Sequence, residues 1–287
     1  DGAVGIPDRP ILVVVQPERI PGPVVHPPHE PGPQRVPLDI PQDREEVLNR
    51  AFQAGVQRII TIGIDLESSL KALDLAAKHP FIFSTVGYHP HNAKEVDPQV
   101  LERLSELARE PKVVAWGEIG LDFYRDRQPR EIQRHCLMQQ LELACELELP
   151  AVFHVRDAFP AFLDLVEAYV PRLTGGVVHC FSGSREVADR VLDWGFHISI
   201  PGTVTYPKAQ MQQEVARRLP SDRILVETDA PFLAPEPHRG KDNEPAYLVH
   251  TALKVAELRG CSLPELARKT TDNARRVFHL GDEELYR

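Results

Sequence analysis

Residues 151–180 read AVFHVRDAFPAFLDLVEAYVPRLTGGVVHC, and this stretch decides the fold class. A short apolar run, Ala151–Val155, is followed by a helical pattern over Ala158–Tyr169 and by a second short run, Val177–Cys180. Short apolar runs that alternate with helical segments of about 10–15 residues are typical of β-α-β units in a parallel sheet. The sequence therefore predicts an α/β fold.

The same alternation continues in both directions and gives seven β-α units. Ile11–Val15 is the one earlier run that could supply an eighth strand, so we expect a (β/α)8 barrel whose first strand is atypical. The competing arrangement is an open doubly wound sheet, but no glycine-rich phosphate loop follows an early strand. The other expected strands are Val56–Ile62, Phe81–Gly87, Lys112–Trp116, Phe196–Ile200 and Ile224–Glu227. The other expected helices are Arg44–Ala54, Glu67–Lys78, Pro98–Glu110, Pro129–Leu149, Arg185–Trp194, Lys208–Leu219, Pro245–Leu258 and Leu263–Val277.

Composition places the chain among ordinary soluble proteins. Of its 287 residues 42% are hydrophobic and 26% are charged, which excludes collagen-like, disordered and membrane-spanning chains. Four cysteines without CxxC spacing are typical of reduced thiols, so we expect a cytoplasmic protein, or a nuclear one in a eukaryote. The net charge of −9 argues against a basic surface that grips nucleic acid. If the protein binds phosphate, we expect a metal ion to supply the attraction.

The first 41 residues differ from the rest of the chain. They hold 11 of the 27 prolines, a composition that disfavours both helix and central strand. We therefore expect two parts, an atypical proline-rich segment at 1–41 and a barrel domain at 42–287. The abrupt change near Pro41 is typical of an altered exon or a shifted reading frame.

Ionisable residues lie in, or just after, five of the expected strands: His89, Glu118, His154, His179 and Asp229. Barrel enzymes build their active sites at the carboxyl ends of the strands, so we expect these side chains to lie together. Imidazoles combined with carboxylates suit zinc, manganese and similar divalent ions. The set Glu118, His154, His179 and Asp229 therefore predicts a metal site.

Taken singly, each of these residues has a simpler interpretation. A histidine such as His154 in an apolar strand is more often a hydrogen-bonded core residue, and the same holds for His179. Glu118, between Gly117 and Gly120, fits a turn, and Asp229 before Ala-Pro fits a cap. The metal hypothesis rests on all four occurring together at strand ends.

Five motifs in order resemble the TatD-like metal-dependent deoxyribonucleases. They are GEIGLD (117–122), FHVRDA (153–158), VHCFSG (178–183), ETDAPFL (227–233) and RGKDNEP (239–245). The resemblance extends from about Asp43 to Leu280. It implies a distorted (β/α)8 TIM barrel of the amidohydrolase-like kind, with two divalent ions that hydrolyse phosphodiester bonds.

The resemblance also implies roles for individual residues. Glu118 would bridge both ions, while His154 and His179 would hold one of them. Asp229 would bind the other ion and orient or deprotonate the attacking water, so Asp229 and Glu118 are the expected catalytic residues. The remaining implied roles are contact with the substrate phosphate by His89 and Arg156, and orientation of a metal ligand by Glu227.

One departure from the family pattern concerns the first strand. The family carries a His-x-His pair there, whereas the one His-x-His here, His89-Pro90-His91, belongs to a later motif. The nearest early histidines, His26 and His29, are separated by two prolines, a spacing that does not put both on one face of a strand. We therefore expect about one tightly bound ion (zinc, magnesium or manganese) and a weaker second site that needs added Mg²⁺ or Mn²⁺.

Three functions follow from these observations. The first is a 3′→5′ exonuclease that cleaves DNA ends with metal-activated water. The second keeps the metal site but acts as an esterase or deacylase on a lactone or a mischarged aminoacyl-tRNA. The third is a catalytically weakened scaffold protein, because the first-strand ligands are missing. A substrate panel separates the first two, and metal content separates both from the third.

Overall fold

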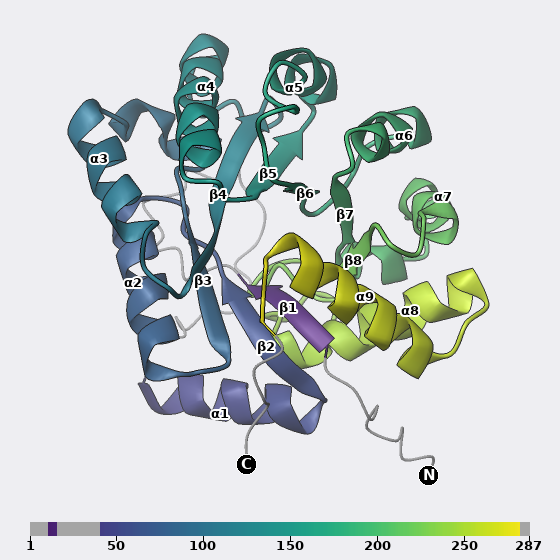
Figure 1. Ribbon diagram of the computed structural model, residues 1–287. Coiled ribbons are helices and arrows are strands. Elements are labelled where there is room, and N and C mark those ends of the chain that lie inside the picture. The colour runs from purple at the N-terminus through teal and green to yellow at the C-terminus, as the bar shows by residue number, and fades with distance from the viewer. Residues whose placement is uncertain (1–10, 16–40, 282–287) are drawn as a thin grey trace, which may run out of the picture.

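The computed structural model describes residues 11–15 and 41–281, and its centre is one eight-stranded parallel sheet (Figure 1). The strands lie side by side in chain order, with no reversal from β1 to β8. A doubly wound sheet requires such a reversal, so the (β/α)8 alternative is confirmed. The strands are β1 Ile11–Val15, β2 Val56–Thr61, β3 Ile82–Val86, β4 Val113–Asp122, β5 Ala151–Arg156, β6 Gly176–Val178, β7 His197–Ile200 and β8 Ile224–Val226.

The barrel is distorted where its first and last strands approach each other. Within residues 11–15 and 41–281 the hydrogen-bonded pairing runs from β1 to β8 without joining those two strands. Helix α9 packs against both β1 and β8 and so covers this side of the sheet. The expectation that Ile11–Val15 supplies the first strand is confirmed by its parallel pairing with β2.

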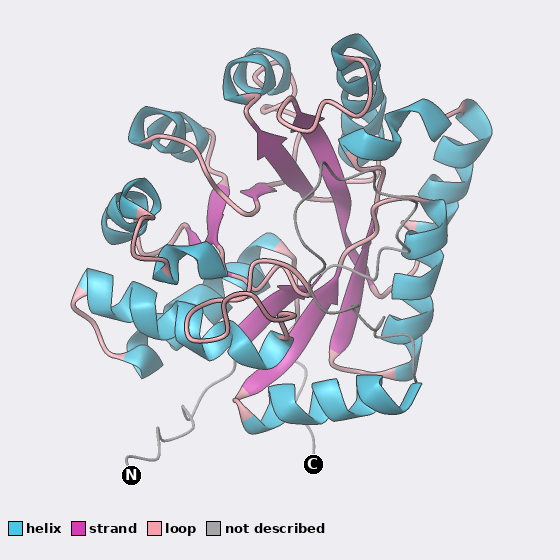
Figure 2. Cartoon of the chain, turned by 180° about the vertical axis from the view of Figure 1, so that it is seen from behind, coloured by secondary structure: helices cyan, strands magenta, loops and turns pink. Residues whose placement is uncertain are grey.

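Helices surround the outside of the sheet (Figure 2). Several begin where the sequence offers a cap, as at Asp65, whose side chain accepts a hydrogen bond from the Ser68 amide, and α8 ends at the left-handed Gly260. None of the helices in the described part of the chain is long and apolar enough to cross a membrane. The helices are α1 Pro41–Gln53, α2 Leu66–Lys78, α3 Pro98–Leu107, α4 Arg130–Glu146, α5 Phe159–Val166, α6 Arg185–Asp193, α7 Gln210–Arg218, α8 Leu248–Arg259 and α9 Leu263–Val277, with short 3₁₀ turns η1 Pro90–Glu95, η2 Gly202–Thr205 and η3 Pro245–Tyr247.

Strand β4 is longer than the sequence pattern predicts. It continues past Trp116 to Asp122, so the GEIGLD motif is part of the strand and does not follow it. Glu118 is therefore a strand residue, and its interpretation as a turn residue is wrong. One extra residue between Trp116 and Ile119 forms a bulge in the pairing with β5, after which the pairing resumes.

Two glycines make this continuation possible. A Cβ on Gly117 would stand 2.6 Å from the Cβ of Val152. A Cβ on Gly120, whose φ is +149°, would stand 1.9 Å from the carbonyl oxygen of His154. Since only glycine permits this approach, these two positions bring the end of β4 against the end of β5.

The apolar core has two parts, one on each side of the sheet. The larger lies between the strands and the surrounding helices and includes Ile59 and Trp116. The smaller holds Val152, Val177 and Leu225 together with residues of α9. Because side chains alternate across a strand, residues two positions beyond these three face the same side.

Most of the proline-rich segment, including His26 and His29, lies outside the described residues. The division of the chain at residue 41 stays a prediction.

Candidate metal centre

The strand alternation carries three candidate residues onto the inner face of the sheet. His154, His179 and Glu227 each come two residues after Val152, Val177 or Leu225, and all lie at the carboxyl ends of their strands. The ring of His154 makes an edge-to-face contact with that of His89, at 4.4 Å between centroids, and lies tilted 5.7 Å from that of His179, so these histidines meet in space. The expected clustering of residues from separate strands is thus confirmed for the histidines.

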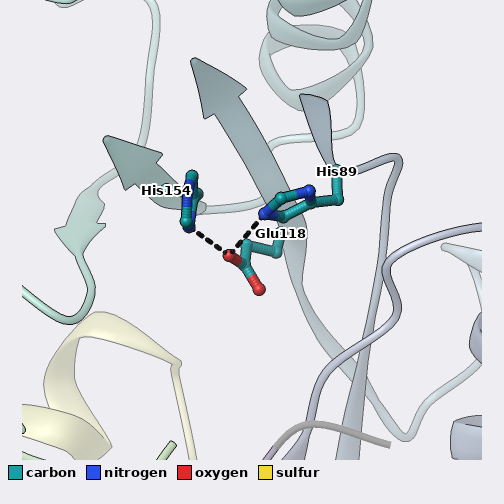
Figure 3. Close-up of side chains that lie close together, drawn as sticks. All are labelled: His89, Glu118 and His154. Atoms are coloured by element: carbon teal, nitrogen blue, oxygen red, sulfur yellow. Dashed lines mark ion pairs between the residues drawn. The ribbon is translucent and has the colours of Figure 1, made fainter. Parts of the chain in front are cut away.

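Glu118 is the centre of this cluster (Figure 3). Its side chain is fully buried, and its Oε1 atom lies 2.8 Å from Nδ1 of His154, 2.8 Å from Nε2 of His179 and 3.4 Å from Nε2 of His89. Three imidazoles from β5, the end of β6 and the segment after β3 therefore converge on one carboxylate oxygen.

A second carboxylate stands behind each of two of these imidazoles. The other nitrogen of His154, Nε2, lies 3.3 Å from Oδ2 of Asp122. The other nitrogen of His179, Nδ1, lies 3.5 Å from Oε1 of Glu227. Each ring is thus placed between two carboxylates, which fixes its orientation and favours its protonated form.

His89 differs from these two rings. Its Nδ1 accepts a hydrogen bond from the backbone amide of His91, at 3.1 Å, so a neutral His89 carries its hydrogen on Nε2, the nitrogen that faces Glu118. By distance alone His89, Glu118 and His154 could share one ion, since their ligand atoms lie within 4.8 Å of one another. This tautomer instead makes His89 a hydrogen-bond donor, through Nε2, and not a metal ligand.

Sequence reasoning missed two residues of this cluster, Asp122 and His91. Asp122 is 1% exposed, and its Oδ2 lies 2.7 Å from Nε2 of His91 as well as near His154. The signal was the spacing within GEIGLD, because Glu118, Gly120 and Asp122 alternate as residues of one strand face. It was overlooked because the strand was expected to end at Trp116.

Two buried glutamines on α4 hold the strand ends that carry these residues. Gln133 accepts from the Asp122 amide at 2.8 Å and donates to the Asp122 carbonyl at 3.2 Å. Gln140 makes the same pair of bonds to Tyr88, at 2.7 and 3.0 Å. Both side chains are fully buried, so they fix the backbones at the ends of β3 and β4.

The β8 side of the cluster is less complete. Glu227 accepts a hydrogen bond from the Cys180 amide at 2.7 Å through Oε1, whereas its Oε2 has no hydrogen-bond partner among the described residues. Oδ1 of Asp229 is also buried and, within the same part of the chain, without a partner. Buried carboxylate oxygens without donors are costly, and a bound cation would satisfy them.

The pKa values follow this difference. Burial raises the pKa of Glu118, but the imidazoles of His179 and His89 outweigh it and hold the pKa well below 4.5. Burial lowers the pKa of His179, but the carboxylates of Glu118 and Glu227 outweigh it and raise the pKa well above 6.5. For Asp229 burial prevails: with Glu227 and Glu118 nearby and only partial compensation from His179, its pKa rises to about 7.

Arg156 lies beside this cluster at the end of β5. The centre of its guanidinium lies 4.1 Å from the centroid of the Tyr124 ring. Among the described residues its side chain makes no ion pair, so its donors are available to an anion. The predicted substrate contact of Arg156 stays a prediction.

The donor set fits a divalent ion. Buried imidazoles and carboxylates gathered at the carboxyl ends of barrel strands are the arrangement expected of metal-dependent hydrolases. This chain belongs to the family of TatD-related DNases, whose model matches residues 36–279. The expected family, the barrel fold and the enzyme class of metal-dependent hydrolase are thereby confirmed.

Individual relatives match this chain over nearly the whole of their own length. An uncharacterized metal-dependent hydrolase of Bacillus subtilis, YabD, is 39% identical over 83% of this chain and 94% of its own. The 3′-5′ ssDNA/RNA exonuclease TatD of Erwinia tasmaniensis is 40% identical over 83% of this chain and 95% of its own. The crystal structure of the TatD homologue YjjV of Escherichia coli K12 matches with a TM-score of 0.79 at 34% identity, over 85% of this chain and 96% of that one.

Proposed function

We propose that this protein is a divalent-metal-dependent nuclease that removes nucleotides from the 3′ ends of single-stranded DNA. The observation that carries the proposal is the placement of His154 and His179, each held between Glu118 and a second carboxylate. A histidine that binds a metal through one nitrogen usually donates from the other to such a carboxylate. The similarity to an exonuclease acting on ssDNA and RNA supports the substrate class.

Glu118, His154 and His179 are the proposed ligands of one ion. Three protein ligands with an open position are the usual count of a catalytic zinc site. When bound, such an ion lowers the pKa of a coordinated water and offsets the charge on the phosphate. With the ion bound, Asp122 and Glu227 would each accept a hydrogen bond from the other nitrogen of the imidazole and so hold its tautomer.

Asp229 is proposed to bind on the open side of the site and to accept the proton of the attacking water. Its Oδ1 has no hydrogen-bond partner among the described residues, which suits a group that meets water or a cation. The raised pKa of Asp229, about 7, shows that the protein alone stabilises its charge poorly. A cation beside it would lower this value and keep the carboxylate ionised.

His89 and Arg156 are proposed to hold the substrate phosphate. The Nε2–H of a neutral His89 is a donor in the middle of the cluster. The Arg156 guanidinium has no ion pair with any described residue and can donate two parallel hydrogen bonds to phosphate oxygens. This local attraction compensates for a net charge of −9.

We propose that the protein binds one ion tightly and a second ion weakly. Strand β1 is Ile11–Val15 and contains no histidine or carboxylate, so it offers no side-chain ligand. Asp229 with a share of Glu118 would hold the second ion, an oxygen-rich set that suits Mg²⁺ or Mn²⁺. We also propose the cytoplasmic location that the composition predicts.

The decisive experiment combines metal analysis with degradation of a 5′-labelled single-stranded oligonucleotide. We expect about one ion per chain, and with added Mg²⁺ or Mn²⁺ a ladder of products shortened from the 3′ end. Immediate release of a labelled mononucleotide would instead mean attack from the 5′ end. Metal binding with hydrolysis of esters or lactones and none of DNA would favour the deacylase alternative. Absence of both metal and hydrolysis would favour the scaffold alternative.

A further inference from the structure

We propose that Tyr124 is a stacking platform for a nucleobase of the single-stranded substrate, an inference that rests on the proposed nuclease function. Tyr124 is 58% exposed, more than any other large hydrophobic side chain in the described part of the chain. A tyrosine ring at this exposure offers a flat apolar face that a planar ligand can cover.

The position of Tyr124 links it to the metal centre. It comes two residues after Asp122, whose carboxylate contacts His154, at the carboxyl end of β4. Asp122 is paired with Arg156 across β4 and β5, and the Phe123 amide donates to the Arg156 carbonyl at 2.9 Å. The ring therefore stands at the rim of the site, in the turn that follows β4, next to strand ends that are fixed by hydrogen bonds.

Its surroundings suit an anionic polymer. The guanidinium of Arg156 lies 4.1 Å from the ring centroid, and that of the exposed Arg125 lies 5.7 Å from it. Neither side chain forms an ion pair with any described residue. In a chain with a net charge of −9, this is a local concentration of unpaired positive charge next to an exposed aromatic face.

Such a pairing of aromatic face and cation matches what a single strand presents. Its bases are unpaired and each has a π-face, while its phosphates attract cations. Stacking is tolerant of sequence, because every base has such a face. An exonuclease that must hold any terminal nucleotide needs this kind of contact, and a base on Tyr124 would leave its phosphate beside Arg156.

The test compares two single-stranded oligonucleotides, one natural and one whose 3′-terminal nucleotides are abasic, with the intact protein and added Mn²⁺. For the parent we expect kcat/KM to be about tenfold higher on the natural strand. Tyr124→Ala should reduce this ratio to near one, chiefly through KM, whereas Tyr124→Phe should keep it. Met211→Ala, which removes another exposed apolar side chain on α7, should keep the parent ratio.

Three outcomes would overturn the proposal. The parent could cleave both strands equally, Tyr124→Ala could retain the ratio, or Tyr124→Ala could slow both strands alike, which would make Tyr124 only a support for Arg156. In each case the natural strand is still degraded and the nuclease function stands. If the parent degrades neither strand with any divalent ion, the proposed function itself fails.

Discussion

The two sides of the metal centre are built from the same residue types, yet they differ in how completely the protein satisfies them. On the β4–β5 side, Glu118 and Asp122 each contact more than one imidazole. On the β8 side, Oδ1 of Asp229 and Oε2 of Glu227 are buried without a hydrogen-bond partner in the described part of the chain. The pKa of Glu118 is accordingly well below its usual value, and that of Asp229 is raised to about 7.

The β4–β5 side is therefore preorganised, whereas the β8 side depends on a ligand. The β4–β5 side is held by its own hydrogen bonds. The β8 side carries an unfavourable buried carboxylate that only a proton or a cation can stabilise.

Removing the close approach of β4 to β5 should have the largest effect. In Gly120→Ala the new Cβ would stand 1.9 Å from the His154 carbonyl oxygen, at a residue whose φ is +149°. Overpacking and backbone strain together should lower the free energy of unfolding by about 4 kcal/mol. Denaturant unfolding measures this loss.

Gly260→Ala is the control for the backbone alone. Gly260 also has a positive φ, +64°, but a Cβ there meets nothing within 4 Å. Gly260→Ala should lower the free energy of unfolding by about 1 kcal/mol. Equal losses for the two variants would show that the approach of β4 to β5 is not tight.

Glu118→Gln should follow in size. It keeps the shape of the side chain but removes the charge on which three imidazoles converge. We expect nuclease activity to fall at least about 100-fold, the scale on which metal-site groups act. Glu142→Gln, which breaks an exposed ion pair with Arg172, should leave activity unchanged. Near-parental activity of Glu118→Gln would contradict its proposed role.

A metal-binding assay should distinguish the two sides of the metal centre. His154→Ala and His179→Ala remove proposed ligands of the tight ion, and each should weaken it by about 10–100-fold. Asp229→Asn should retain the tight ion and lose the weak Mg²⁺ or Mn²⁺ site. Equilibrium dialysis with zinc and manganese measures both. Loss of the tight ion in Asp229→Asn would mean that both sides hold the same ion.

Much of this fold could be predicted from the sequence because strand and helix periodicities are local. The order of units and the eight strands, apart from the end of β4, follow from apolar runs such as Val177–Cys180, which the structure places at Gly176–Val178. The end of β4 could not be predicted, because Gly117 and Gly120 are usually read as breakers of a strand. Their role depends on the closeness of β5, which is a tertiary contact.

The site shows the same limit. Glu118, His154 and His179 could be chosen from residue type and strand position, and the structure brings them together. Asp122 and His91 could not be predicted, because they are distant from each other in sequence and because no strand is expected after Trp116. Hydrogen-bond partners such as Gln133 follow from helix packing, which periodicity does not specify.

The smallest effect should come from a histidine outside the metal centre. His197 is buried on β7, and burial together with Arg223 and Arg276 lowers its pKa to about 4, despite a smaller opposing effect of Asp222. The histidines of the metal centre behave oppositely, because carboxylates raise their pKa. His197 thus tests whether burial lowers the pKa of a histidine when it outweighs the effect of a nearby carboxylate.

The depressed pKa means that the folded protein keeps His197 neutral while the unfolded chain binds a proton below its ordinary value, 6.5. Stability from this residue is therefore complete above pH 6.5 and is lost as the pH falls toward 4. Between pH 7 and 5.5 the loss should be about 1 kcal/mol. His197→Gln, compared with the parent by denaturant unfolding, should show a decline smaller by that amount. His135→Gln, at an exposed position on α4, should decline like the parent. An unchanged decline in His197→Gln would show that the imidazole titrates equally in the folded and unfolded chain.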